Sequence, residues 1–123
     1  MRCERCSPET DAWDVVCRGT RAYAGCVEGL VRLALETREA GALRSGEILV
    51  MPMTNPGAVP AMLRAGAVVT DRGGRLCHAA VNCREFQKPC IVGTSNATIA
   101  VKTGDYVRVC STEGVVRFRK RDV

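Results

Sequence analysis

The chain has few aromatic residues and no long apolar segment. Phe, Trp and Tyr make up 4% of the 123 residues, so the core has to be built from aliphatic side chains. No uninterrupted run reaches about 18 apolar residues, the length that a membrane-spanning helix needs, and we expect no membrane association. With 46% hydrophobic residues, the chain is apolar and long enough to form a globular domain.

The N-terminal segment lacks the apolar block of a signal peptide, because charged and polar residues alternate over residues 1–16. Eight cysteines in a chain without an export signal are typical of reduced thiols. We therefore expect a cytoplasmic protein. We expect no disulfide framework either, since a domain of this length does not need covalent staples.

Positive charge is concentrated at the C-terminal end. The net charge is +5, and the residues that contribute there are Arg117, Arg119, Lys120 and Arg121. A basic cluster can indicate nucleic-acid binding, but no stacking aromatic residues are interleaved with these charges. We interpret the cluster as a solvated last strand and tail, and expect no nucleic-acid partner.

The order of apolar and turn-forming segments indicates an α/β domain with short mixed strands and two or three short helices. We interpret residues 1–18 as a polar, cysteine-bearing N-terminal extension with a short helix near residues 11–17, followed by a domain over residues 19–123. Strands are expected at 26–35, 47–53, 67–70 and 89–93, and helices at 59–65 and 79–86. Two alternating segments, 106–110 and 115–119, predict a C-terminal β-hairpin.

His78 is the only histidine of the chain and stands at the start of an expected helix. The N–H groups and the dipole at a helix start favour negative charge. An unperturbed imidazole is partly the nucleophilic free base at neutral pH. A histidine in this position is suited to accept, carry and release a phosphoryl group.

The residues before His78 have properties that suit phosphate binding. A glycine pair allows positive φ and a close approach of the backbone to a phosphate, and an arginine offers a forked donor. A cysteine is small enough for the expected helix cap, and a threonine ends the preceding strand. We predict that the phosphate-supporting residues around His78 are Thr70, Gly73, Gly74, Arg75 and Cys77.

The pattern Gly73-Gly74-x-x-Cys77-His78-Ala79-Ala80 resembles the phosphohistidine motif of the mobile, swivelling domain of phosphoenolpyruvate-utilising enzymes. Phosphoenolpyruvate synthase (pyruvate, water dikinase) and pyruvate, phosphate dikinase carry that domain. The resemblance extends over residues 19–117 and includes Gly25, Gly29, the segment 46–50, Thr54, Pro56, Pro89, Gly93, Gly104 and Gly114. It implies a compact swivelling β/β/α domain.

The same resemblance implies that His78 receives a phosphoryl group at a nucleotide site and delivers it to a pyruvate or phosphoenolpyruvate site. Neither an ATP-grasp nucleotide domain nor a phosphoenolpyruvate-binding barrel fits within 123 residues. We therefore expect a free-standing carrier, a phosphotransferase component that is incomplete on its own. Its expected partners are a separately encoded ATP-grasp protein and a phosphoenolpyruvate- or pyruvate-binding protein. ATP and Mg²⁺ are expected on a partner, and no cofactor on this domain.

Departures from the family pattern leave a second function open. Leu76 stands where many members have threonine, and Asn82, Gln87 and Cys110 also differ. These departures are compatible with a binding or regulatory module that kept the fold and lost the chemistry. Such a module would hold its partner equally well without His78.

The cysteines suggest a third function, a zinc-stabilised interaction protein. Four thiolates can hold one zinc ion, and the candidates are Cys3, Cys6, Cys17 and Cys26. We expect the other thiols and thioethers to be small or adaptable core residues, namely Cys83, Cys90, Cys110, Met51, Met53 and Met62.

Overall fold

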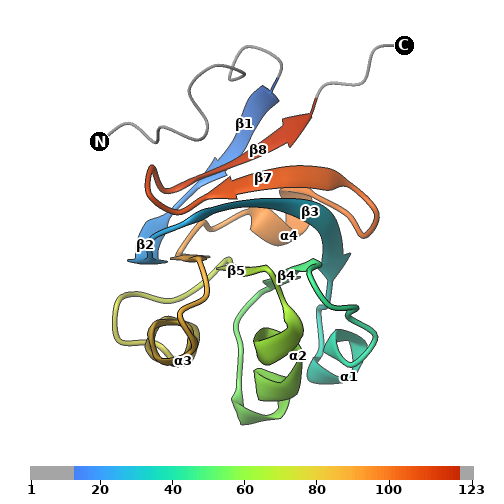
Figure 1. Cartoon of the computed structure of the whole chain (residues 1–123), viewed down its shortest axis with the longest axis vertical. Helices are drawn as coiled ribbons and strands as arrows, with labels where there is room; N and C mark the ends of the chain where they lie inside the picture. Colours follow the sequence, from blue (N-terminus) through green and yellow to red (C-terminus); the bar gives the residue numbers. More distant parts are fainter. Residues whose placement is uncertain (1–12, 120–123) are drawn as a thin grey trace.

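Eight β-strands form one hydrogen-bonded sheet in the computed structural model, which describes residues 13–119 (Figure 1). The strands are β1 (Trp13–Arg18), β2 (Thr20–Tyr23), β3 (Cys26–Leu33), β4 (Ile48–Met51), β5 (Ala67–Thr70), β6 (Cys90–Val92), β7 (Tyr106–Cys110) and β8 (Val115–Arg119). Their order is β1-β8-β7-β3-β4-β5-β6-β2. The half from β1 to β3 is antiparallel, the half from β3 to β6 is parallel, and β2 closes the far edge as an antiparallel strand.

Three of the helices cover the parallel half of the sheet on the face away from the antiparallel half (Figure 1). They are α1 (Thr37–Ala40), α2 (Val59–Arg64) and α3 (His78–Phe86). The fourth helix, α4 (Ala97–Ala100), packs between the two halves, where it contacts β1, β4 and β5. Two layers of strands and one layer of helices result.

Strands β4, β5 and β6 are buried on both faces, as strands covered on each side must be. In β4, Ile48 and Val50 pack against the antiparallel half. The alternate residues Leu49 and Met51 pack against the helical layer. The same alternation runs through β5 and β6, so one set of strands serves two cores. This arrangement confirms the expected α/β fold class with its β/β/α layers.

The helix expected near residues 11–17 is wrong, because Trp13–Arg18 is strand β1. β1 pairs antiparallel with β8, and Trp13 and Cys17 are buried. The Arg108 guanidinium lies over the Trp13 ring, 4.5 Å from its centre. Contacts with residues distant in sequence therefore determine the secondary structure of this segment. Residues 13–18 of the expected extension belong to the sheet. Residues 1–12 lie outside the described part of the chain.

The other predicted helices and strands lie within a few residues of their expected positions. The C-terminal hairpin, strand β5 and the start of α2 are confirmed at the predicted positions. β2, α1 and α4 were not predicted, so the described residues contain four α-helices, besides the 3₁₀ helix Pro56–Ala58, rather than two or three helices. Each of these three elements has four residues, which is too short for hydrophobic periodicity to mark it.

The cysteines behave as core residues. Cys83, Cys90 and Cys110 are fully buried, as predicted, and no disulfide joins the six described cysteines. A side-chain hydrogen bond between Cys83 and Cys90, together with burial, raises the pKa of the Cys90 thiol above its ordinary value. Among the methionines, Met51 and Met62 are buried, but Met53 is 52% exposed. The prediction for Met53 is wrong because this residue follows the end of β4 and lies in a loop.

The expectation of a solvated last strand is also wrong at Arg117. β8 lies between β1 and β7, so its residues have a neighbouring strand on each side. The Arg117 side chain is 11% exposed, and its Nη2 donates to Glu113 Oε1 at 2.9 Å. Lys120 and Arg121 lie outside the described residues.

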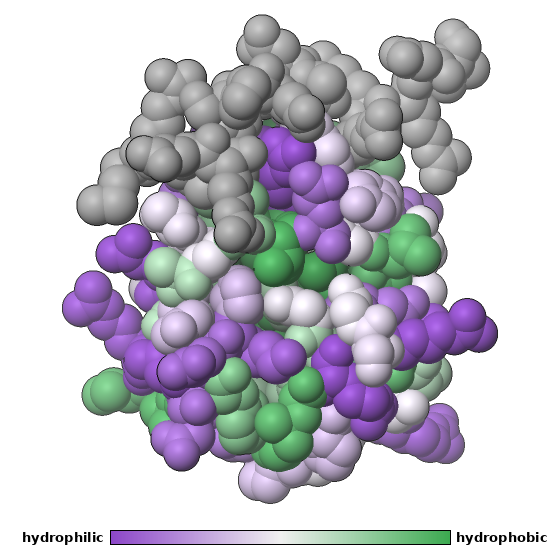
Figure 2. Space-filling view, viewed as in Figure 1, coloured by the Kyte–Doolittle hydropathy of each residue, from purple (hydrophilic) through white to green (hydrophobic). Residues whose placement is uncertain are grey.

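The surface mixes hydrophilic and hydrophobic residues, and a group of hydrophobic residues lies over α2 in the space-filling view (Figure 2). Leu63 of α2 is 51% exposed. Within residues 13–119, no helix combines the length and the apolar character needed to span a membrane.

Glu47 links the start of β4 to β3. Its carboxylate accepts hydrogen bonds from the Arg32 guanidinium at 3.2 and 3.3 Å and from the Arg44 backbone N–H at 2.6 Å. Desolvation of the carboxylate raises its pKa, but the hydrogen bonds and charges of Arg44 and Arg32 together lower the pKa of Glu47 below its ordinary 4.5. The charged form therefore stabilises the fold.

We predict that Glu47→Gln lowers the free energy of unfolding by about 1–2 kcal/mol at pH 7, because it removes charge-assisted hydrogen bonds at a mostly covered site. Since the pKa is lowered in the folded state, the contribution is present above pH 4.5 and is lost as the pH falls through the folded-state pKa. Urea unfolding from pH 7 to pH 3 measures the difference. Glu85→Gln, at an exposed position of α3, is the matched control. An equal effect at both positions would contradict this account.

Candidate functional site

The candidate site lies at the carboxyl ends of the parallel strands, where the loops after β4, β5 and β6 meet. The N–H of Asp71, directly after β5, donates to Met51 O at 3.2 Å. The N–H groups of Thr94 and Ser95, after β6, donate to Thr70 O at 3.1 Å and to Asp71 O at 2.8 Å. Sites in α/β sheets commonly form at this edge. These bonds fix the loop of residues 71–77, which leads into α3.

His78 is the first residue of α3, a helix of nine residues, and is partly exposed. Its Nδ1 lies 2.8 Å from Thr54 Oγ1, and Thr54 itself is 3% exposed. Its carbonyl oxygen accepts a hydrogen bond from Asn82 Nδ2 at 2.9 Å. The buried threonine thus holds one ring nitrogen and leaves Nε2 for chemistry.

The hydrogen bond to Thr54 connects the tautomer of His78 to its reactivity. If Nδ1–H donates to Thr54 Oγ1, then Nε2 carries the lone pair and is nucleophilic. If the Thr54 hydroxyl donates to Nδ1 of the neutral ring, then Nε2 carries the proton and cannot attack. A reactive His78 therefore has its proton on Nδ1 and Thr54 as the acceptor.

The start of α3 offers backbone donors next to this imidazole. The first N–H groups of a helix have no intrahelical acceptor, and the N-cap residue Cys77 makes no side-chain capping hydrogen bond. These N–H groups and the helix dipole favour an anion at this end. The position of Cys77 at the helix cap agrees with the sequence prediction.

The two glycines before His78 have different roles. Gly73 has φ +115°, and a Cβ built there would lie 2.7 Å from Cys77 Sγ. A side chain at this position is therefore excluded both by the backbone conformation and by the cysteine. Gly74 does not have positive φ, and a Cβ there would meet nothing within 4 Å. Gly74 leaves the surface beside the loop open.

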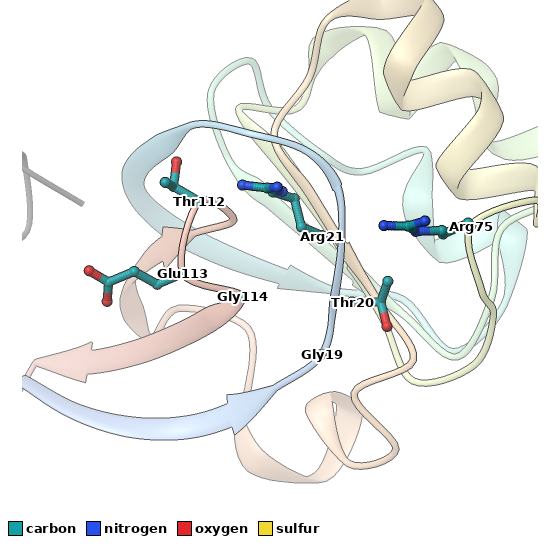
Figure 3. A pocket seen from close by; sticks show the side chains of 7 residues that line it. All are labelled: Gly19, Thr20, Arg21, Arg75, Thr112, Glu113 and Gly114. Atoms are coloured by element: carbon teal, nitrogen blue, oxygen red, sulfur yellow. The ribbon is translucent and has the colours of Figure 1, made fainter. Parts of the chain in front are cut away.

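Within residues 13–119, no hydrogen bond or ion pair joins Thr70 or Arg75 to His78. Thr70 is buried, and its hydroxyl donates to Arg72 O at 2.7 Å, so it holds the loop. Arg75 is exposed, and its side chain lines a separate hollow with Arg21, of which His78 is not a lining residue (Figure 3). The Arg84 guanidinium donates to the Arg75 carbonyl oxygen and ties this loop to α3.

Thr54 contacts His78 but is not among the site residues predicted from the sequence. It entered that reasoning only as part of a family resemblance, and no spacing relates it to His78. A signal was available, because Thr54 is a polar residue shortly after the strand Ile48–Met51, which is buried throughout. Polar residues just beyond the carboxyl end of a parallel strand are candidates for a site.

The described cysteines do not form the proposed zinc site. Cys17 lies in β1 and Cys26 in β3, with β8 and β7 between them. Three interstrand spacings of about 4.8 Å separate these strands by roughly 14 Å, whereas zinc binds each sulfur at about 2.3 Å. Burial, together with the charge of Asp71, raises the pKa of Cys17 to about 11. Cys3 and Cys6 lie outside the described residues, and no cluster in residues 13–119 could hold a metal ion.

Solved structures share the fold. Enzyme I, in a solution structure of the protein nEIt, superposes with a TM-score of 0.56 at 30% identity, and the match covers 68% of this chain and 34% of that chain. Aconitase X of Thermococcus kodakaraensis superposes with a TM-score of 0.68 at 19% identity, covering 85% of this chain and 98% of that chain. At that identity the second likeness concerns the fold alone.

Curated relatives match over most of the chain. Phosphoenolpyruvate synthase of Pyrococcus furiosus is 46% identical over 108 residues, which are 88% of this chain and 13% of the relative. Phosphoenolpyruvate synthase of Neisseria meningitidis serogroup B is 42% identical over 104 residues, 85% of this chain and 13% of the relative. The profile of the family described as "PEP-utilising enzyme, mobile domain" matches residues 43–114, which include Thr54 and His78. Because profile and relatives agree over most of its length, the chain belongs to the family of the mobile domain of phosphoenolpyruvate-utilising enzymes.

Proposed function

We propose that this domain is a phosphoryl carrier in which His78 shuttles a phosphoryl group between a nucleotide site and a pyruvate or phosphoenolpyruvate site on partner proteins. The observation that carries this proposal is the 2.8 Å contact between Thr54 Oγ1 and His78 Nδ1. It leaves Nε2 as the free ring nitrogen of the first residue of α3, a helix whose N-cap makes no side-chain hydrogen bond.

The transfer step follows from this geometry. The Nε2 lone pair attacks the phosphorus atom of the donor, the bond from phosphorus to the leaving oxygen breaks, and a phosphoramidate forms. The proton stays on Nδ1, and the Nδ1–H donates a hydrogen bond to Thr54 Oγ1. The backbone N–H groups at the start of α3 offset the charge on the phosphoryl oxygens, which is the main requirement of phosphoryl transfer. Attack by an acceptor on the phosphorus atom reverses the step and frees Nε2.

Transfer in trans is part of the proposal. This chain spans 13% of the length of the Pyrococcus furiosus phosphoenolpyruvate synthase that it resembles. In this proposal the nucleotide site, which binds ATP and Mg²⁺, and the phosphoenolpyruvate site are on partner proteins. A carrier that moves between two sites needs in-line positioning at each of them rather than a complete pocket of its own.

We predict that the chain takes up one phosphoryl group at His78. Two donors test this: phosphoramidate, which needs no partner, and phosphoenolpyruvate with Pyrococcus furiosus phosphoenolpyruvate synthase whose own carrier histidine has been replaced. Intact-mass measurement should show the added phosphoryl group, its loss in acid, and its absence in His78→Ala. If neither donor labels the wild-type chain, or if His78→Ala is labelled equally, the carrier function is excluded. A partner complex that survives His78→Ala without any labelling would indicate the binding module instead.

We also predict that Thr54→Val slows phosphorylation by phosphoramidate about fivefold or more. A net hydrogen bond of about 1 kcal/mol corresponds to about a fivefold change in the ratio of the two tautomers. Thr54→Ser keeps the hydroxyl and should remain near the wild-type rate. Because the chain has one histidine, its imidazole ¹⁵N shifts report the tautomer directly. A folded Thr54→Val variant with unchanged rate and unchanged shifts would show that Thr54 does not position His78.

A further inference from the structure

A polar hollow of about 310 Å³ lies apart from His78, where three segments distant in sequence meet (Figure 3). Gly19 lies between β1 and β2, and Thr20 and Arg21 belong to β2. The turn of the β7–β8 hairpin contributes Thr112, Glu113 and Gly114. Arg75 comes from the loop that leads to His78. The volume of the hollow is at the lower end of the range for small-molecule sites.

The backbones of two glycines meet at this hollow. The Gly19 N–H donates to Gly114 O at 2.9 Å. Gly114 has φ +73°, and a Cβ built there would lie 2.8 Å from Gly19 O. A larger residue at Gly114 would force the two turns apart, so this glycine allows the close approach of the backbones beside the hollow.

The side chains around the hollow provide positive charge and unused donors. Within residues 13–119, neither the Arg21 nor the Arg75 guanidinium makes a hydrogen bond or an ion pair, and both side chains are exposed. The hydroxyls of Thr20 and Thr112 also make no hydrogen bond in the described part of the chain. The one carboxylate, that of Glu113, binds Arg117 at 2.9 Å and points away from both arginines (Figure 3).

We propose that this hollow is an anion site that binds the phosphate group of a small molecule, separate from the phosphoryl group on His78. Guanidinium groups bind phosphate oxygens through two parallel hydrogen bonds, and hydroxyls add further donors. The volume accommodates inorganic phosphate or a small phosphate ester. A bound phosphate would bridge Arg21 of β2 and Arg75, and would thereby hold the loop that precedes His78.

The test is a titration of the ¹⁵N-labelled His78→Ala chain. This substitution removes the histidine that would be phosphorylated, so the result does not depend on the carrier function. Inorganic phosphate and glycerol 3-phosphate are the ligands, with sodium chloride at matched ionic strength as the control. The amide signals of Gly19, Thr20 and Gly114 should shift with both ligands or with the ester alone. Tighter binding of the ester identifies an ester as the ligand, and equal binding identifies free phosphate.

Arg21→Gln and Arg75→Gln should each weaken phosphate binding about tenfold, because each removes a charge-assisted contact. Arg72→Gln is the matched control, since Arg72 is an exposed arginine of the same loop that does not line the hollow. Affinity should fall as salt is added. The proposal is overturned if neither ligand shifts these amides, if both arginine variants bind as the control does, or if the shifts are confined to the amides of Ala79 and Ala80 at the start of α3.

Discussion

The contact between Thr54 and His78 is the constraint on which the account of this domain depends. A histidine at a helix start has two ring nitrogens, and either could face solvent. The buried hydroxyl of Thr54 occupies Nδ1, so chemistry is directed to Nε2. His78 is the first residue of α3, whose N-cap makes no side-chain hydrogen bond, so backbone donors at this helix start are available to offset charge on a phosphoryl group. Without this contact the site would be only a helix N-terminus with an imidazole.

The fold supplies the contact through its parallel half. Thr54 follows β4, and His78 is reached through the loop that follows β5, so two adjacent parallel strands bring residues 24 positions apart together. Burial of β4 and β5 on both faces keeps their ends in register. The same loop carries Arg75 to the hollow beside β2 and the hairpin turn. One loop therefore connects the histidine to a second cluster of positive charge.

Much of the fold could be predicted from local pattern, and much of the site could not. Alternation and turn residues located the hairpin and β5, whereas β1 was mistaken for a helix because its stability comes from β8 and from the stacking of Arg108 on Trp13. The glycine–cysteine–histidine pattern located His78. Thr54 was missed as a site residue because its role arises from pairing of β4 with β5. Arg75 is expected to support a phosphoryl group at His78 from its place in the sequence, but sequence proximity does not give the direction of a side chain, and the structure shows Arg75 lining the separate hollow.

The most direct test of this account is to determine which ring nitrogen of His78 bonds to phosphorus. The chain has a single histidine, so long-range ¹H–¹⁵N and ³¹P NMR of the phosphorylated, ¹⁵N-labelled chain reports one imidazole without assignment. The account predicts phosphorus bonded to Nε2 and a proton retained on Nδ1. Phosphorus on Nδ1, or an imidazole that stays unmodified with every donor, would contradict it.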